Sequence, residues 1–368
     1  MRRPDRGISK KVSPTSFFVS ITVVLTFMPK RESGRYVLYM ETCKNTLVNI
    51  YSEILDSYHD ESELKSLRTS ITFYEFVETM FFRFKNKCEH IDSEDLISIM
   101  KGNFRGNCTK RRFLNAIDRM IEKYRIILQN IYHGNLKSAI KHTEELMNSK
   151  KHLSYYFDDK YINYLTGYVK KDIKLYRMRD VKKEDAKPND CWHIPFTLRS
   201  QATIQRYNMS GYPCLYLADS EETANKELGT INVHKNRWCS EFSTIQSISL
   251  FDLTIPSIDD IKDEDSNSYL LGWLLTYPLR MLCSLKVYNE ANFPEEYIFP
   301  QFFFHWIYLM KGYNFRNGFV YSSTKLVGGK NYVFPAKYKT KTPPKYEDVQ
   351  IGENLQQLFD ASAPELYA

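Results

Sequence analysis

Five side chains in four short segments of this 368-residue chain could act together on a phosphate-bearing sugar. Arg177 lies in the segment LYRMRD, and the pair Arg206 and Tyr207 lies in QRYNMSGYP. Glu227 lies in TANKELG, and Ser323 lies in VYSSTK. Taken alone, each has an ordinary explanation, such as a surface ion pair, a solvated helix face or a turn. Their combination in one chain is what indicates a site.

These residue types meet the requirements for cleaving NAD⁺ at the nicotinamide ribose. The planar fork of an arginine suits the two charges of a pyrophosphate. An aromatic face, such as that of Tyr207 or of Tyr216 in CLYLAD, can hold the cationic nicotinamide ring. A carboxylate stabilises the oxocarbenium-like ribose of the transition state, and a hydroxyl can fix the sugar by hydrogen bonding. Such a site needs neither a metal nor a covalent nucleophile.

The order and local context of these residues resemble the RES family, which consists of NAD-consuming enzymes, mostly bacterial toxins. The resemblance covers about residues 172–340. It implies catalytic roles for three residues, Arg177, Glu227 and Ser323. It implies that NAD⁺ is bound by Arg206, Tyr207 and Tyr216.

Two of these assignments leave an alternative open. Arg179 is two residues after Arg177, so in a strand it shares the same face and could take the same role. Ser322 is adjacent to Ser323, and one sequence cannot separate them. His193, in CWHIPF, could serve as a base, but we expect it to be a structural histidine with satisfied hydrogen bonds.

The resemblance implies that nicotinamide is released from NAD⁺ and that the acceptor is water or inorganic phosphate. NAD⁺ would then be the substrate, with no prosthetic group or metal. By analogy, depletion of NAD⁺ would serve a toxin–antitoxin system or phage defence, with an antitoxin protein as partner. One alternative is an ADP-ribosyltransferase that modifies a macromolecule. Another is a non-enzymatic interaction protein.

The charge distribution argues against nucleic acid or membrane as a partner. The net charge is +7, but residues 1–40 hold eight basic and two acidic side chains, which leaves +1 for the rest. No general basic field therefore remains to attract either polyanion. The seven cysteines are widely spaced and form no Cys/His ligand cluster. This pattern is typical of reduced thiols in a cytoplasmic protein.

Four regions are expected along the chain: a leader over 1–39, a helical domain over 40–167, a RES-like catalytic domain over 168–345 and a tail over 346–368. The leader contains an apolar run of 13 residues, SFFVSITVVLTFM, which is too short to span a bilayer. No small-x-small cleavage site follows it, so we expect translation to begin at Met40, with an export signal as the alternative.

The elements that must position the candidate residues differ between the two halves. Apolar residues at steps of three and four predict three helices, in ITFYEFVETMFFRFKNK, RRFLNAIDRMIEKYRIILQNIY and LKSAIKHTEELMN, and we expect these stripes to be core. A turn at Gly134 should separate the last two.

Short strands and two helices are expected after about residue 167. The strands are DIKLYRMRD, YPCLYLAD, STIQSISLFDLT, NGFVYSST and NYVFPAK. One helix is EETANKEL, capped by Ser220 and ended by Gly229, and the other lies in YIFPQFFFHWIYLMKGYN. The tail reads as weakly helical. The predicted fold class is α+β: an N-terminal helical bundle followed by a mixed β-sheet domain, which the resemblance implies to be ADP-ribosyltransferase-like.

Overall fold

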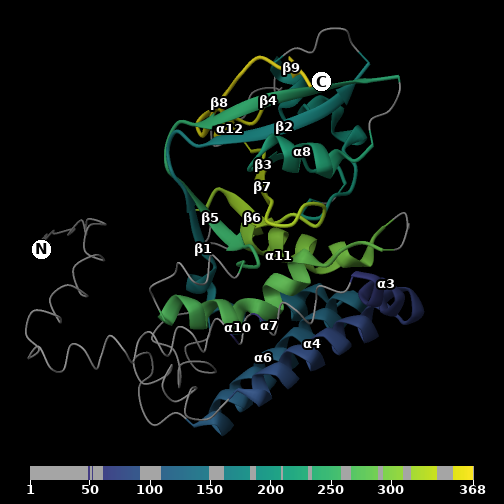
Figure 1. The fold of residues 1–368 in the computed structure, drawn as a ribbon, viewed down its shortest axis with the longest axis vertical. Coiled ribbons are helices and arrows are strands. Elements are labelled where there is room, and N and C mark those ends of the chain that lie inside the picture. The colour runs from purple at the N-terminus through teal and green to yellow at the C-terminus, as the bar shows by residue number, and fades with distance from the viewer. Residues whose placement is uncertain are drawn as a thin grey trace, which may run out of the picture.

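The computed structural model describes residues 61–91, 109–148, 161–182, 188–208, 210–230, 234–257, 267–288, 293–309, 316–337 and 351–367, together with Asn49 and Ser52. The predicted leader and the start at Met40 lie outside the described residues. The described chain is a mixed α/β structure in which helices cover part of a curled mixed sheet (Figure 1).

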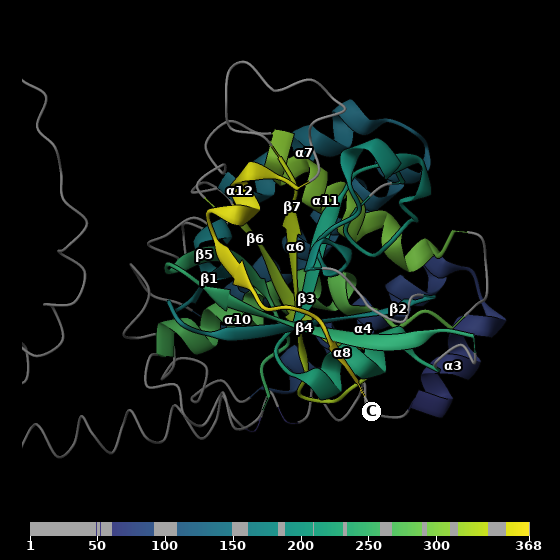
Figure 2. The same ribbon diagram turned by 90° about the horizontal axis from the view of Figure 1, so that it is seen from above.

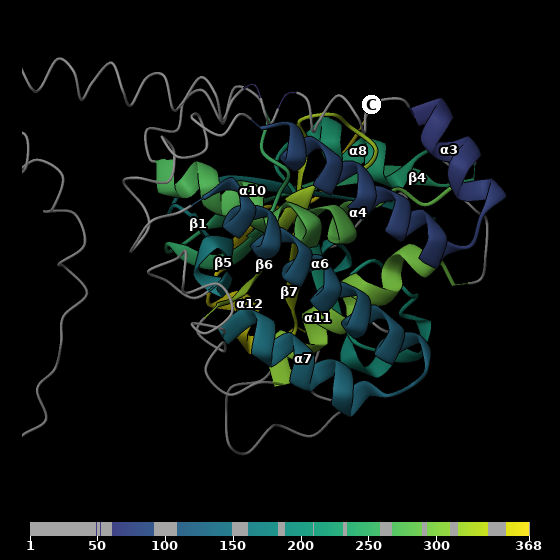
Figure 3. The same cartoon turned by 90° about the horizontal axis from the view of Figure 1, so that it is seen from below.

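Helices α3, α4, α6 and α7 form an outer layer, at the bottom of Figure 1 and nearest the viewer in Figure 3. Their bounds are Glu61–Ser70, Phe73–His90, Lys110–Tyr132 and Leu136–Asn148. The three helices predicted from apolar stripes are confirmed as α4, α6 and α7. Thr72 begins α4 with a capping box, in which it exchanges hydrogen bonds with Glu75. Gly134, with φ of 73°, makes the predicted turn between α6 and α7.

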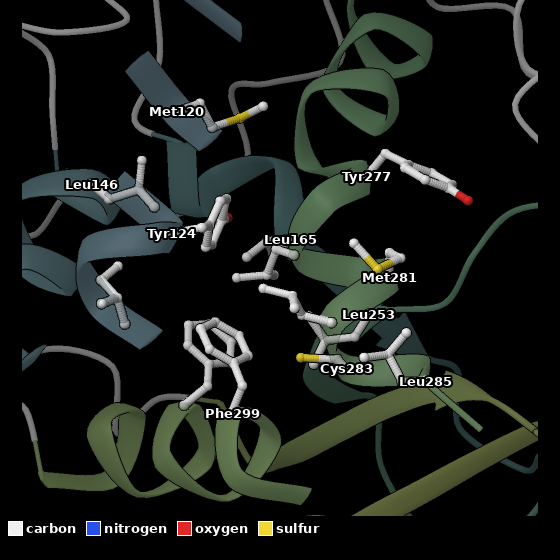
Figure 4. Close-up of a cluster of buried hydrophobic side chains, with 14 of the residues drawn as sticks. Met120, Tyr124, Leu146, Leu165, Leu253, Tyr277, Met281, Cys283, Leu285 and Phe299 are labelled. Atoms are coloured by element: carbon white, nitrogen blue, oxygen red, sulfur yellow. The ribbon is translucent and has the colours of Figure 1, made fainter. Parts of the chain in front are cut away.

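One continuous apolar core joins this outer layer to helices α10 (Asn267–Ser284) and α11 (Ile298–Leu309). Figure 4 shows Met120 and Tyr124 of α6 around the same interior as Met281 of α10 and Phe299 of α11. The predicted helix in YIFPQFFFHWIYLMKGYN is confirmed as α11. The boundary at residue 167, a separate bundle and the likeness to ADP-ribosyltransferases stay predictions.

Helix α10 was not predicted, so the expectation of two helices in the second half was wrong. Its side chains from Leu274 to Cys283 are buried almost without exception, which leaves no polar face for the pattern to reveal. It also contains Pro278, which in a sequence indicates a break. Burial on all sides stabilises this helix in spite of both features.

The second half forms a nine-stranded sheet in the order β1-β5-β6-β7-β3-β2-β4-β8, with β9 beside β4. The strands from β1 to β9 are Thr166–Val169, Lys174–Val181, Cys214–Ala218, Asn236–Thr244, Ile248–Leu253, Gly318–Ser322, Lys330–Pro335, Phe359–Ala361 and Glu365–Leu366. The five predicted strands are confirmed as β2, β3, β5, β6 and β7. Among the strand pairs that the structure describes, β5 and β6 alone are parallel. The chain between them passes through α10 and α11, as a parallel crossover requires.

The two faces of the sheet pack against different elements, because side chains alternate along each strand. On one face, Leu215 and Phe242 pack with Leu355 near the C-terminus. On the other face, Phe319 packs in the core that includes α10 and α11. Ala218 packs there with α8 (Glu221–Leu228), which lies beside β2, β3 and β4 in Figure 2.

The tail completes the edge of the sheet. Residues 351–367 form the short helix α12 (Glu353–Gln356) and strands β8 and β9, both of which pair with β4. The prediction of a weakly helical tail is thus right for α12 and wrong for the two strands. The unpaired backbone groups along the edge of β4 supply partners that the sequence of the tail does not reveal.

Two further predictions concern the chemistry of the chain. The five described cysteines carry free thiols, as expected, and all but Cys239 are buried. Among the helices that the structure describes, none combines the length and the apolar character needed to cross a bilayer.

Candidate active site

Helix α8 holds Glu227 near its C-terminal end. Ser220 begins the helix as predicted, and its hydroxyl accepts the N–H of Thr223 at 3.1 Å. Gly229 ends the helix with φ of 74°, also as predicted. Arg237 of β4 fixes this end by donating to the carbonyl oxygen of Gly229 at 3.0 Å. The backbone of Glu227 is therefore held firmly, although its side chain is exposed.

The turn between β6 and β7 brings Ser323 to Glu227. The Ser323 hydroxyl donates to Oε1 of Glu227 at 2.6 Å, and it accepts the N–H groups of residues 325 and 326 at 3.1 and 3.0 Å. A side chain at Gly329 would bring its Cβ to 2.7 Å from Oγ1 of Thr223. Glycine at 329 therefore allows the turn to lie this close to α8.

Asn331, the second residue of β7, is a site residue that sequence reasoning missed. Its amide nitrogen donates to the same Oε1 of Glu227 at 2.6 Å, and the residue is 5% exposed. Strand pairing places it between Ala218 of β3 and Tyr321 of β6. The sequence held only a weak signal, an asparagine in a predicted strand shortly after Ser323.

The structure separates the two adjacent serines. The hydroxyl of Ser322 accepts the N–H of Ile255 at 2.9 Å, so this side chain ties β6 to the segment after β5. The hydroxyl of Ser323 faces Glu227. Ser323, rather than Ser322, therefore belongs with Asn331 to the group of side chains that binds the Glu227 carboxylate.

Arg177 and Arg179 of β2 are held by backbone carbonyls. Nη1 of Arg177 donates to the oxygen of Tyr216, and Nη1 of Arg179 donates to the oxygen of Asp190, each at 2.7 Å. Within the described part of the chain, neither arginine forms an ion pair, and Nε of Arg177 is buried without a hydrogen bond. Burial and, to a smaller degree, the charge of Arg179 lower the pKa of Arg177 to about 10. The pair is thus a concentration of positive charge that forms no ion pair with a carboxylate among the described residues.

The structure does not bring Arg177 into hydrogen-bonding contact with Glu227 or Ser323. Alternation along β2 places Tyr176 on the face that packs with α8 and Arg177 on the other face. However, β2 and β3 pair only at Tyr176 and Ala218, and Arg177 reaches across this junction to the carbonyl of Tyr216. Tyr216 and Ala218 are two residues apart, roughly 7 Å along the strand. Strand β3 therefore connects the two groups. Arg177 binds the carbonyl of Tyr216 in β3, and Ala218 of β3 pairs with Asn331, which binds Glu227.

Arg206 and Tyr207 lie in the core and bind the C-terminal end of α10. Arg206 donates to the carbonyl of Leu285 at 2.8 Å and lies over the ring of Tyr297, with its guanidinium carbon 5.1 Å from the ring centroid. The hydroxyl of Tyr207 donates to the carbonyl of Cys283 at 3.3 Å, and its side chain is fully buried. A cation at the carbonyl end of a helix is favourable. These contacts give both residues a role in the fold, and their predicted role in binding NAD⁺ stays a prediction.

Aromatic rings connect this buried pair to the carboxylate. Tyr207 lies 4.7 Å from Tyr321 between ring centroids, and Tyr216 donates its hydroxyl to Asn208 at 2.7 Å. Burial, followed by the nearby charge of Glu227, raises the pKa of Tyr321. Tyr321 is thus an aromatic residue beside Glu227 that sequence reasoning did not select, although it lies two positions before Ser323.

His193 has the structural role that was predicted. Its Nδ1 lies 2.6 Å from the carbonyl oxygen of Ile194, and its Nε2 accepts the N–H of Gly352 at 2.8 Å. Burial lowers its pKa to about 4, so the ring is neutral near pH 7. Both ring nitrogens are occupied, which leaves none for a substrate.

The fold and the site together define a mixed α/β protein with an exposed, oriented carboxylate at one end of a short helix. In the residues that the structure describes, no group of three His, Cys, Asp or Glu side chains could hold a metal ion. The Glu227 carboxylate, which accepts hydrogen bonds from Ser323 and Asn331, is suited to electrostatic and hydrogen-bonding chemistry.

The chain is similar to a Bacillus subtilis (strain 168) protein named "Putative toxin YopC", with 24% identity over 249 residues. The match covers 62% of this chain and 53% of that protein, so this chain aligns with about half the length of its relative. No family model and no solved structure matches the chain.

Proposed function

We propose that this protein cleaves NAD⁺ between nicotinamide and ribose and acts as a toxin. The observation that carries this proposal is the 2.6 Å hydrogen bond between Ser323 and Glu227. The resemblance to RES enzymes assigns both residues to catalysis although they are 96 positions apart. Packing of α8 against the β6–β7 turn brings the two residues together, and no local sequence pattern predicts this contact.

The carboxylate of Glu227 would act on the ribose. As the bond to nicotinamide breaks, positive charge develops on the sugar, and a carboxylate held nearby stabilises it. Ser323 is placed to orient both Glu227 and a sugar hydroxyl. Water or inorganic phosphate would then attack the ribose carbon, giving ADP-ribose or its 1-phosphate.

The pair Arg177 and Arg179 would bind the phosphate groups. Two like charges on one strand face, without an acid partner in the described residues, disfavour each other. An anion with several oxygens relieves this repulsion and supplies acceptors for the buried Nε of Arg177. In this arrangement Arg177 reaches the substrate from the β2–β3 junction, while Glu227 reaches it from α8.

The enzymatic part of the proposal is tested by incubating purified protein with NAD⁺ and separating the products by chromatography, with and without phosphate. Nicotinamide is expected in both cases, accompanied by ADP-ribose or, with phosphate, by its 1-phosphate. Recovery of all NAD⁺ unchanged would refute the activity. Label transferred from NAD⁺ to a protein or nucleic acid would instead favour an ADP-ribosyltransferase.

The toxin role draws on the printed name of the bacterial relative. Inducible expression in a bacterium should lower cellular NAD⁺ before growth stops. Expression of the Glu227→Gln variant should leave cellular NAD⁺ and growth unchanged. Glu222→Gln, an exposed change on the same helix, should behave as the native chain. Growth arrest with normal NAD⁺ would separate toxicity from NAD⁺ cleavage.

A further inference from the structure

Both hydrogen bonds to the Glu227 carboxylate end on one oxygen. The hydroxyl of Ser323 and the amide nitrogen of Asn331 each lie 2.6 Å from Oε1. Oε2 accepts no hydrogen bond from the residues that the structure describes. A carboxylate oxygen has two lone pairs, so Oε1 is saturated and Oε2 keeps its full capacity.

The two donors are themselves fixed. Asn331 lies in a strand that is paired on both sides, with Ala218 and with Tyr321, so its backbone cannot shift independently. The hydroxyl of Ser323 accepts two backbone N–H groups, which leaves its proton to point at Glu227. Ser323 and Asn331 are named here the carboxylate clamp.

We infer that the carboxylate clamp presents Oε2 of Glu227 as the oxygen that meets the sugar, and that Asn331 is a positioning residue for this reaction. An exposed glutamate in the last turn of a helix otherwise samples several rotamers. Two charge-assisted hydrogen bonds select one of them. Orientation of this kind contributes to the rate because a misplacement of about 1 Å can cost about 100-fold. The inference rests on the proposed function.

The test measures nicotinamide release by Asn331→Ala in two backgrounds, the native chain and Glu227→Gln, at enzyme concentrations high enough to quantify the slower rates. In the native background kcat should fall by about 10- to 100-fold while KM changes less than about threefold. In the Glu227→Gln background the same change should alter kcat by less than about twofold, because Asn331 acts through the carboxylate.

Asn354 provides a matched control. It is 3% exposed, and its side chain donates to the carbonyl of Pro335 at 2.9 Å and accepts the N–H of Lys337 at 2.7 Å. Asn354→Ala should lower the unfolding temperature without a rate effect that depends on the background. An equal fractional loss of kcat from Asn331→Ala in both backgrounds would overturn the positioning role. If the native chain releases no nicotinamide, or if Glu227→Gln releases it at the native rate, the proposed function itself fails.

If the alanine variant does not fold, Asn331→Asp provides a second test, because it keeps the shape of the side chain. It places a carboxyl group against Oε1, and two carboxyl groups that share a site retain one proton to higher pH than either alone. Tyr321, which pairs with position 331 across the strands, has its pKa raised by burial and by Glu227 and stays neutral. The activity of Asn331→Asp relative to the native chain should therefore rise as the pH falls from about 8 to about 5.5, because the shared proton restores a donor. A ratio that stays constant with pH would contradict the clamp.

Discussion

Glu227 and Arg206 are both charged residues in segments predicted to form the site, yet their surroundings differ. Glu227 is exposed, and one of its oxygens is free of hydrogen bonds from the described residues. Arg206 is 7% exposed, donates to the carbonyl of Leu285 and lies over the ring of Tyr297. A side chain whose bonding capacity is used within the protein stabilises the fold. A side chain with accessible capacity left over can act on a substrate.

The strongest way to break this comparison is Glu227→Gln, which keeps the shape and removes the charge. We expect kcat for nicotinamide release to fall by about 1,000-fold, since loss of a preorganised electrostatic group costs about 10²- to 10³-fold. The unfolding temperature should change by less than about 2 °C, because an exposed carboxylate contributes little to stability. The two quantities are measured by chromatography of products and by calorimetry. A stable variant with the native rate would remove Glu227 from the site.

Arg206→Met should show the opposite pattern. It removes the donor to the buried carbonyl oxygen of Leu285, while the carbonyl of Cys283 keeps the hydroxyl of Tyr207. The free energy of unfolding should fall by about 3 kcal/mol, and the unfolding temperature by roughly 4 °C. Thermal unfolding followed by circular dichroism measures this. An unchanged unfolding temperature together with a raised KM for NAD⁺ would instead support the predicted binding role of Arg206.

Sequence periodicity was sufficient for elements that have one polar face. Helices α4, α6 and α7 and the capped helix α8 were all predicted, because each is amphipathic or carries a terminal signal. Helix α10 and strand β4 were not. The first has no polar face, and the second carries Arg237, a buried arginine whose partner Asp180 is on the neighbouring strand. Such a residue is readable only after the strands are paired.

The same limit applied to the candidate site. Glu227 and Ser323 were identified because short local motifs surround them. Asn331 was not, since an asparagine in a strand acquires its role only when β7 lies beside β6 and beneath α8. Likewise, no local pattern indicates that Arg206 faces the end of α10, which is 77 positions away along the chain. Long-range contacts therefore decided which predicted polar residues have free bonding capacity.

A buried titratable group that serves the fold should make stability, rather than activity, depend on pH. His193 is such a group and provides a test. Its pKa is lowered to about 4 by burial, whereas the unfolded chain has the ordinary value of about 6.5. Between these values the unfolded state binds more protons, so stability is full above about pH 6.5 and is lost as the pH falls towards 4. Urea unfolding should show a loss of up to about 3 kcal/mol over this range. His193→Gln should flatten the slope, and the same change at the exposed His133 should not.

The adjacent serines offer the smallest and sharpest contrast. Ser322→Ala removes the acceptor for the N–H of Ile255 and should cost about 1 kcal/mol of stability with an unchanged kcat. Ser323→Ala removes one of the two donors to Oε1 of Glu227 and should lower kcat about tenfold, which corresponds to about 1.4 kcal/mol. It should also cost about 1 kcal/mol of stability, because the turn loses its acceptor. Urea unfolding measures the stability of each variant, and nicotinamide release measures its kcat. Since the stability losses are matched, only the orientation of Glu227 distinguishes the pair, and equal rates would show that the hydroxyl of Ser323 serves the turn alone.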